Sequence, residues 1–296
     1  MTEIYLLYSV PLALFAGFGV RWYIVGRDPS VRKKLPLQFA PPKNIRPAEA
    51  GTLIDEKADN DDLIGTILDL AIRKNILIHD HGGAFDFELV EDFENDDGVI
   101  EFEKQLLRIM FGRDNKRSLE TVKIHLLSRL WEIKQKLYKN MQEKGWYTQN
   151  PDKIHSRYAQ WGGLFFILGI IIIVANTFKF IPSNISLHAS MSLISSSIII
   201  YAFAKIMPRR TKQGHEIYEH MIGLHQYLLH PGHSAPTYFT EQKESFEKLL
   251  PYAIIFGCLN MWLTHYNKIA KIPPHWYRGS MIDFNEHIEK LVQELA

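Results

Sequence analysis

Three long stretches without a charged side chain constrain this 296-residue chain more than any other feature. They run from Ile4 to Val20, from Ala159 to Phe178 and from Ile185 to Ala204. About 20 residues of helix, at about 1.5 Å per residue, cross a hydrocarbon core of roughly 30 Å. Because the bilayer offers no water to backbone groups, each stretch is predicted to form a transmembrane helix.

Each span has an alternative. The first could be a cleaved signal peptide, but only Glu3 precedes it as a charge and no small-residue cleavage site follows. The second and third could instead form a buried hairpin in a soluble protein. A fourth uncharged segment, Leu249–Asn267, is also long enough to span. Its Pro251 and Gly257 lower its affinity for lipid, so we expect a core or interfacial helix that starts at Pro251.

Lysine and arginine near the spans predict the orientation. Basic residues follow the first and third spans and precede the second, whereas the loop between the second and third carries only Lys179. Positively charged flanks stay in the cytoplasm. We therefore expect the N-terminus outside a plasma (inner) membrane and the main domains inside. The residues expected at the membrane interface are Arg21, Arg27, Arg32, Lys33, Lys34, Arg209, Arg210, Trp276 and Tyr277.

The overall composition hides this organisation. The mean hydropathy is −0.13 and the net charge is +1, values that would suit a soluble protein. They exclude a disordered chain and a globally basic nucleic-acid binder. The expected fold class is a mainly α membrane protein. Its segments are a first transmembrane helix (1–24), a basic proline-rich linker (25–47), a cytoplasmic domain (48–150), a transmembrane hairpin (159–206) and a C-terminal helical module (207–296).

The 48–150 segment has the pattern of a winged-helix-like α+β domain. Helical periodicity over Ala48–Asp55 and Asp61–Asn75 is followed by alternating residues on both sides of Gly82-Gly83, which predicts a β-hairpin. Glu101–Phe111 and Leu119–Lys144 are predicted to add amphipathic helices. In the C-terminal module, helices are expected over Lys212–His230 and about Asp283–Leu295.

Charge argues against nucleic-acid binding by this domain. Residues 48–103 hold 17 acidic and 3 basic side chains, whereas residues 104–150 hold 11 basic and 4 acidic ones. DNA affinity depends on lysine and arginine neutralising phosphates, and the second helix offers only Arg73 and Lys74. The acidic segment is expected to meet a basic protein surface or the basic linker and 113–144 helix of its own chain. A solvated acidic face without a partner is the alternative.

Four segments resemble the YciQ-like predicted membrane proteins, a family with a domain of unknown function 2207. They are GRDP at Gly26–Pro29, the residues around PAEAG and DDLIGTILDLAIRKNILI, TKQGHEIYEHMIGLHQYL from Thr211, and FEKLLPYAIIFGCLNMW from Phe246. The motif residues are Gly26, Asp28, Pro29, Thr211, Gly214, Gly223, Tyr227, Leu250, Pro251, Tyr252, Gly257 and Trp262. The family usually has an N-terminal extracytoplasmic domain and a Gly-Phe-Arg motif where this chain has Gly223-Leu224-His225, so the resemblance implies a shortened or split member.

No catalytic constellation emerges from the sequence. His215, His220, His225, His230 and His233 recur every three to five residues and do not share a helix face, so no metal site is expected. Cys258 lies in an apolar run without a basic neighbour and is expected to be a buried hydrophobe. No phosphate-binding loop or nucleophile elbow is present. We expect neither an enzyme nor a cofactor.

The expected function is a membrane-anchored scaffold or regulatory module that binds cytoplasmic or membrane protein partners. A subunit of a transport or channel assembly is one alternative, although its spans hold no charge. A membrane-tethered nucleic-acid binder is another, disfavoured by the acidic domain. Membrane lipids are expected partners. Small-residue pairs, Ala13/Gly17 and Ser192/Ser196, would permit close helix contact within the chain or in a homo-oligomer.

Overall fold

The computed structural model describes residues 2–29, 35–180, 183–229, 243–269 and 272–296. The chain divides into two compact units. The membrane unit comprises residues 1–30 and 145–213, and the globular unit comprises residues 31–144 and 214–296. Each unit is therefore built from two separate parts of the sequence.

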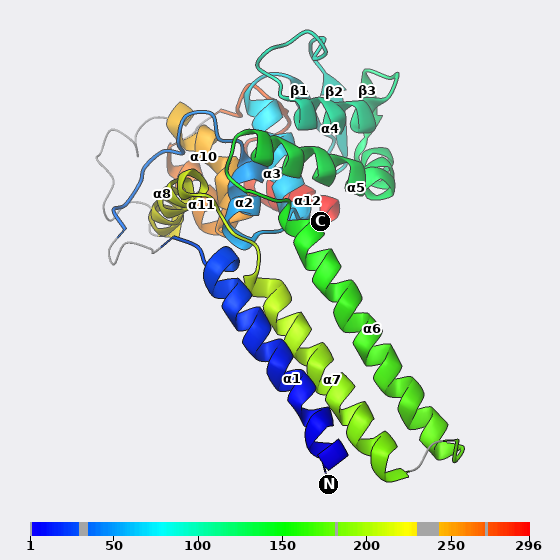
Figure 1. Ribbon diagram of the computed structural model, residues 1–296. Coiled ribbons are helices and arrows are strands. Elements are labelled where there is room, and N and C mark those ends of the chain that lie inside the picture. Colours follow the sequence, from blue (N-terminus) through cyan, green and yellow to red (C-terminus); the bar gives the residue numbers. More distant parts are fainter. Residues whose placement is uncertain (1, 30–34, 181–182, 230–242, 270–271) are drawn as a thin grey trace. The chain divides into compact units, whose positions relative to one another are not determined.

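The membrane unit is a bundle of three long helices, shown in blue, green and yellow-green in Figure 1. They are α1 (Thr2–Arg21), α6 (Pro151–Thr177) and α7 (Ser183–Ile206), with a π-helical turn at Trp22–Gly26 after α1. Within the described residues, these three helices alone are long and apolar enough to cross a membrane. The three predicted spans are thus confirmed as candidate membrane helices.

Small residues allow α6 and α7 to approach each other closely. A Cβ added to Gly162 would come within 2.9 Å of the Tyr201 ring, and one added to Gly169 would come within 2.9 Å of Ile194. The Ser192 hydroxyl donates to the Leu7 carbonyl of α1 at 2.6 Å. Ser192 and Ser196 are buried at helix contacts, as their spacing suggests.

The other small-residue pair is not at such a contact. Ala13 and Gly17 are exposed on α1, and a Cβ at Gly17 would meet no atom of the described chain within 4 Å. Their spacing therefore does not mark a helix contact within the described bundle.

The globular unit contains eight described helices around a four-stranded sheet. The helices of its first half are α2 (Pro47–Asp55), α3 (Asn60–Ile72), α4 (Glu101–Phe111) and α5 (Leu119–Glu143). The second half supplies α8 (Lys212–Leu229, which begins in the membrane unit), α10 (Lys243–Ile255), α11 (Leu259–Ile269) and α12 (Phe284–Leu295).

The sheet has the order β3-β2-β1-β4. The predicted hairpin is β1 (Ile76–Asp80) and β2 (Phe85–Leu89), whose turn places Gly82 and Gly83 at positive φ. The added strands are β3 (Lys116–Ser118), antiparallel to β2, and β4 (Tyr277–Arg278), parallel to β1. Two helices followed by a hairpin are present, but the flanking strands were not predicted, and the winged-helix assignment stays a prediction.

The two segments predicted as separate cytoplasmic modules form one unit. Helix α10 packs against α2 and α3, α12 packs against α3, and β4 extends the sheet begun by β1. The Cβ position of Gly65 lies 3.1 Å from the Pro251 carbonyl, so a glycine in α3 permits this close approach. Most of the predicted segments 48–150 and 207–296 therefore forms one folded body, whereas residues 145–150 and 207–213 belong to the membrane unit.

The uncharged segment 249–267 belongs to this core. It forms the end of α10 and most of α11, separated at Gly257, which adopts a φ of +65°. Ala253, Trp262 and Leu263 are fully buried. The expectation of a core helix is therefore correct in location, but Pro251 lies inside α10 and does not begin a helix.

Trp276 and Tyr277 correct a second expectation. Both side chains are buried in the globular unit and pack on Phe284 of α12, with ring centroids 6.0 and 4.9 Å away. Tyr277 pairs with Ile78 in the sheet. Placing these aromatics at a lipid interface was wrong, because the globular core already buries them.

Candidate functional site

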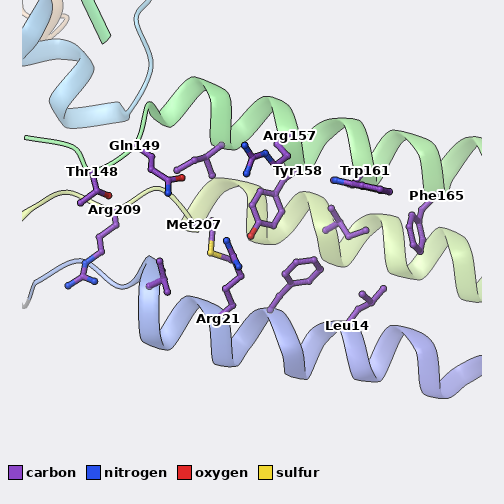
Figure 2. A pocket seen from close by; sticks show the side chains of 14 residues that line it. Leu14, Arg21, Thr148, Gln149, Arg157, Tyr158, Trp161, Phe165, Met207 and Arg209 are labelled. Carbon is purple, nitrogen blue, oxygen red and sulfur yellow. The ribbon is translucent and has the colours of Figure 1, made fainter. Parts of the chain in front are cut away.

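A cavity of about 430 Å³ lies between the helices of the membrane unit (Figure 2). This volume falls in the range of roughly 300–1,000 Å³ typical of ligand pockets. Side chains from α1, α6, α7 and the segments next to them line it. They are Leu14, Phe18, Arg21, Val25, Thr148, Gln149, Ile154, Arg157, Tyr158, Trp161, Phe165, Ile200, Met207 and Arg209.

The two ends of this cavity differ in polarity. Figure 2 shows Thr148, Gln149 and Arg209 toward one end, and Leu14 and Phe165 toward the other. Leu14 precedes Arg21 by seven helical residues, which corresponds to about 10 Å along α1. The cavity therefore changes from polar to apolar along the helix axes.

Three arginines face this cavity without a carboxylate partner among the described residues. Arg21 is in the last turn of α1, Arg157 is near the start of α6, and Arg209 follows α7. All three are exposed. Arg21 and Arg209 were predicted at the membrane interface, whereas Arg157 was noted only as a flanking charge.

Arg210 behaves differently from its neighbour Arg209. Its Nη1 donates to Asp28 Oδ2 at 2.6 Å, and its backbone N–H donates to Asp28 Oδ1 at 2.8 Å. Tyr147 forms a β-bridge with Arg210. The Arg210 guanidinium is therefore buried in an ion pair and does not face lipid, contrary to the expectation. This ion pair holds the backbone of residue 210 in place and thereby positions the neighbouring Arg209.

The other predicted interface residues divide into two groups. Arg27 is exposed and lies over the Tyr23 ring, 5.8 Å from its centroid. Arg32, Lys33 and Lys34 lie outside the described residues, as do His230 and His233.

Family-motif residues in the membrane unit hold chain segments together. Asp28, followed by Pro29, pairs with Arg210 as described above. Gly26 permits close contact with Met207, because a Cβ added to this glycine would lie 3.1 Å from the methionine sulfur. Thr211 donates to the Gly145 and Trp146 carbonyls, through its hydroxyl at 2.6 Å and its N–H at 2.9 Å. These residues join the segments at one end of the three helices.

Motif residues in the globular unit have the same role. A Cβ on Gly223 would overlap the Pro36 carbonyl, so this glycine admits the linker against α8. Tyr252 donates to the Ile45 carbonyl at 3.0 Å. The Trp262 indole donates to the Phe246 carbonyl at 3.1 Å. The remaining buried motif residues are Gly214, Tyr227, Leu250 and Pro251, and Gly257 ends α10.

Part of the acidic segment forms ion pairs within the globular unit. Burial raises the pKa of Glu49, while its partner Lys144, 2.5 Å away, lowers it. The basic partners come from the linker, from the end of α3 and from residues 116–144. The pairs are Lys144–Glu49, Arg46–Glu103, Arg73–Glu103, Lys136–Glu101 and Lys116–Asp86.

A polar cluster that sequence reasoning missed joins β1, β4 and α12. Asp80 accepts hydrogen bonds from the Tyr277 hydroxyl, from His287 and from the Gly83 N–H, the last at 2.7 Å. Burial alone would raise the pKa of Asp80, but these hydrogen bonds lower it. Its three partners lie up to 207 residues away, so no local pattern could reveal the cluster.

No group of three or more potential metal ligands occurs among the residues that the structure describes. Cys258 is buried, and burial raises the pKa of its thiol to about 11. At neutral pH this thiol is therefore protonated and a poor nucleophile.

Helix α5 carries a second candidate site, an exposed apolar stripe. Ile124, Leu127 and Trp131 are 59%, 55% and 70% exposed, although Val122 and Ile133 of the same helix are fully buried. Beside the stripe runs a shallow groove between α3, α5 and α12, which includes Leu126, Leu127, Leu130 and Leu295. The spacing i, i+3, i+7 is the signal that could have revealed this second apolar face in the sequence.

Three helices that are long and apolar enough to cross a membrane, together with a separate α+β unit, indicate a membrane protein. A family model described as "Predicted membrane protein (DUF2207) C-terminal domain" matches residues 36–266. The chain belongs to this family, which confirms the resemblance. No curated protein and no solved structure matches the chain.

Proposed function

We propose that this protein is a scaffold or regulatory module of the plasma (inner) membrane, whose globular unit binds a protein partner in the cytoplasm. The observation that carries the proposal is the exposed stripe Ile124–Leu127–Trp131 on α5. The basic flanks of the spans support the cytoplasmic orientation. For the winged-helix-like part we propose protein binding and not nucleic-acid binding. Arg73, one of the few basic residues near α3, already pairs with Asp69 and Glu103 and is not available for phosphate groups.

The stripe has the form of a helix-docking surface. Surface helices of globular proteins normally bury one apolar face and expose a polar one. Helix α5 buries one apolar face in the globular unit and exposes another, with a tryptophan, the residue type enriched among binding hot spots. Residues at i, i+3 and i+7 are the anchors by which helices pack into partner grooves.

The occupant we propose is an amphipathic helix of a partner protein that carries acidic residues. The groove beside the stripe is small, about 20 Å³, and it is lined mainly by leucine and isoleucine side chains, which would contact the apolar face of such a helix. Lys123 lines the groove and Lys134 lies one turn beyond Trp131. Acidic side chains on the partner would complement these two charges and favour association.

Photocrosslinking in native membranes tests this proposal. A photoreactive amino acid is placed at Leu127 of the full-length chain, and a control is placed at Lys139, which is also exposed but outside the stripe. The expected product is one protein adduct at Leu127, mapped by mass spectrometry to an amphipathic helix with acidic residues. Trp131→Ser should reduce its yield.

Three outcomes would contradict the proposal. Adducts with lipid alone would make the stripe a membrane-contacting surface, and adducts with a second copy of the chain would make it a homo-oligomer interface. Equal adducts at Leu127 and Lys139 would show that the stripe confers no preference.

A further inference from the structure

The geometry points to a binding site for an anionic phospholipid in the cavity of the membrane unit. This site does not depend on the α5 stripe, and it gives the three cavity arginines a ligand of opposite charge. The phosphate would lie between Arg21 and Arg157, with the charge of Arg209 toward the end near Thr148, and an acyl chain would extend past Phe18 toward Leu14.

Charge gives the first argument. Arg21, Arg157 and Arg209 come from three different segments and line one cavity, which gives this cavity three positive charges. Figure 2 shows Arg21 and Arg157 beside Tyr158, and Arg209 at the end with Thr148 and Gln149. Within the described part of the chain no carboxylate pairs with them, although Asp28 pairs with Arg210 next to Arg209. Arginine guanidinium groups match phosphate oxygens through paired hydrogen bonds.

The change in polarity gives the second argument. A soluble anion would need only the polar end of the cavity, whereas the apolar end, with Leu14, Phe18 and Phe165, suits a hydrocarbon chain. The depth of about 10 Å from Arg21 to Leu14 fits within one leaflet of a core roughly 30 Å thick. A ligand with a charged head and an apolar tail therefore matches both ends.

The position along the spans gives the third argument. Arg21 ends α1, Arg157 is in the second turn of α6, and Arg209 comes three residues after α7. These helix ends lie at the same side of the bundle, where lipid headgroups begin. Basic pockets between transmembrane helices at this level are known to hold anionic headgroups.

Native mass spectrometry of the full-length protein in non-ionic detergent tests the inference. The probes are phosphatidylglycerol and phosphatidylcholine with the same acyl chains, and free glycerol phosphate as a competitor. One cation near a lipid headgroup contributes about fivefold in affinity, so three give roughly a hundredfold preference for phosphatidylglycerol. Glycerol phosphate should not displace the lipid.

Charge variants separate the cavity from net charge. The triple variant Arg21→Gln, Arg157→Gln, Arg209→Gln should lose the preference and retain its binding of phosphatidylcholine. A matched triple variant, Lys153→Gln, Lys205→Gln, Lys212→Gln, removes the same charge from residues of this unit that do not line the cavity, and should retain the preference.

A variant at the apolar end of the cavity tests the site independently, in case the triple variants do not fold. Leu14→Trp fills the cavity and should weaken both lipids equally while Arg21 remains.

Several results would overturn the inference. These are equal binding of the two lipids by the unaltered protein, an equal loss in both triple variants, or unchanged lipid binding in Leu14→Trp. Displacement by glycerol phosphate would instead identify a site for a free anion.

Discussion

Replacing Trp262 distinguishes a core role for segment 249–267 from a membrane-spanning one. The indole is fully buried, stacks on Phe246 with ring centroids 3.9 Å apart, and donates to the Phe246 carbonyl at 3.1 Å. In a transmembrane helix the same side chain would face lipid or other spans, and its removal would leave the globular unit intact. Trp262→Ala therefore reports directly on where this segment lies.

The expected cost follows from these contacts. Truncation of a buried tryptophan to alanine destabilises a protein by about 3–5 kcal/mol, which includes the cavity it leaves. Trp262→Phe keeps an aromatic ring against Phe246 and loses mainly the N–H donor, so we expect a loss of about 1–2 kcal/mol. The order Ala, then Phe, then unaltered protein should appear as rising stability of the globular unit.

Urea unfolding of the full-length protein in non-ionic detergent micelles, followed by pulse proteolysis, measures this order. Trp131→Ala is the matched control, because the same truncation at a side chain 70% exposed should change stability by no more than about 0.5 kcal/mol. The reasoning is refuted if Trp262→Ala is as mild as Trp131→Ala, or if a reporter fused at residue 296 lies on the opposite side of the membrane from one at residue 150.

Three further changes probe the joints of each unit. Asp28→Ala removes one charge-assisted hydrogen-bond partner from the buried Arg210 guanidinium, and we expect a loss of about 1.5–3 kcal/mol, measured by thermal unfolding in detergent. Gly223→Ala should destabilise the globular unit in urea, because its Cβ would overlap the Pro36 carbonyl, whereas a neutral result would contradict that close contact. Burial, and secondarily the charge of Asp59, raises the pKa of Asp62 well above its usual range. Above pH about 4 the unfolded chain therefore loses this proton while the folded protein keeps it, so the free energy of unfolding should fall as pH rises. The fall amounts to about 1.4 kcal/mol per unit of pKa shift. Asp62→Asn should flatten that dependence in urea titrations at several pH values, and an unchanged slope would assign it to other groups.

The sequence was sufficient for the features that depend on local chemistry. The three spans follow from about 20 uncharged residues each, because hydrocarbon forces such a segment to satisfy its own backbone. The hairpin follows from Gly82-Gly83 between alternating residues, and α3 follows from its apolar period.

Contacts between residues far apart in the sequence could not be predicted from local patterns. The pairing of Ile78 with Tyr277 joins segments about 200 residues apart, and Asp28 meets Arg210 across 182 residues. A two-residue strand such as β4 has no period of its own, so Trp276 and Tyr277 could be assigned only by their aromatic character. The cavity was likewise hidden, because whether Arg157 faces Arg21 depends on how each helix is rotated about its axis.

The residues expected to form the family motif and the surfaces proposed to bind ligands are different sets. Asp28, Gly223 and Trp262 stabilise joints and core contacts, so changing them should unfold a unit. The cavity arginines and the α5 stripe are exposed side chains, whose replacement leaves the folded structure largely unaffected. Family membership therefore specifies the folded structure, and the proposed ligand sites lie at Arg157 and Trp131, positions outside the motif.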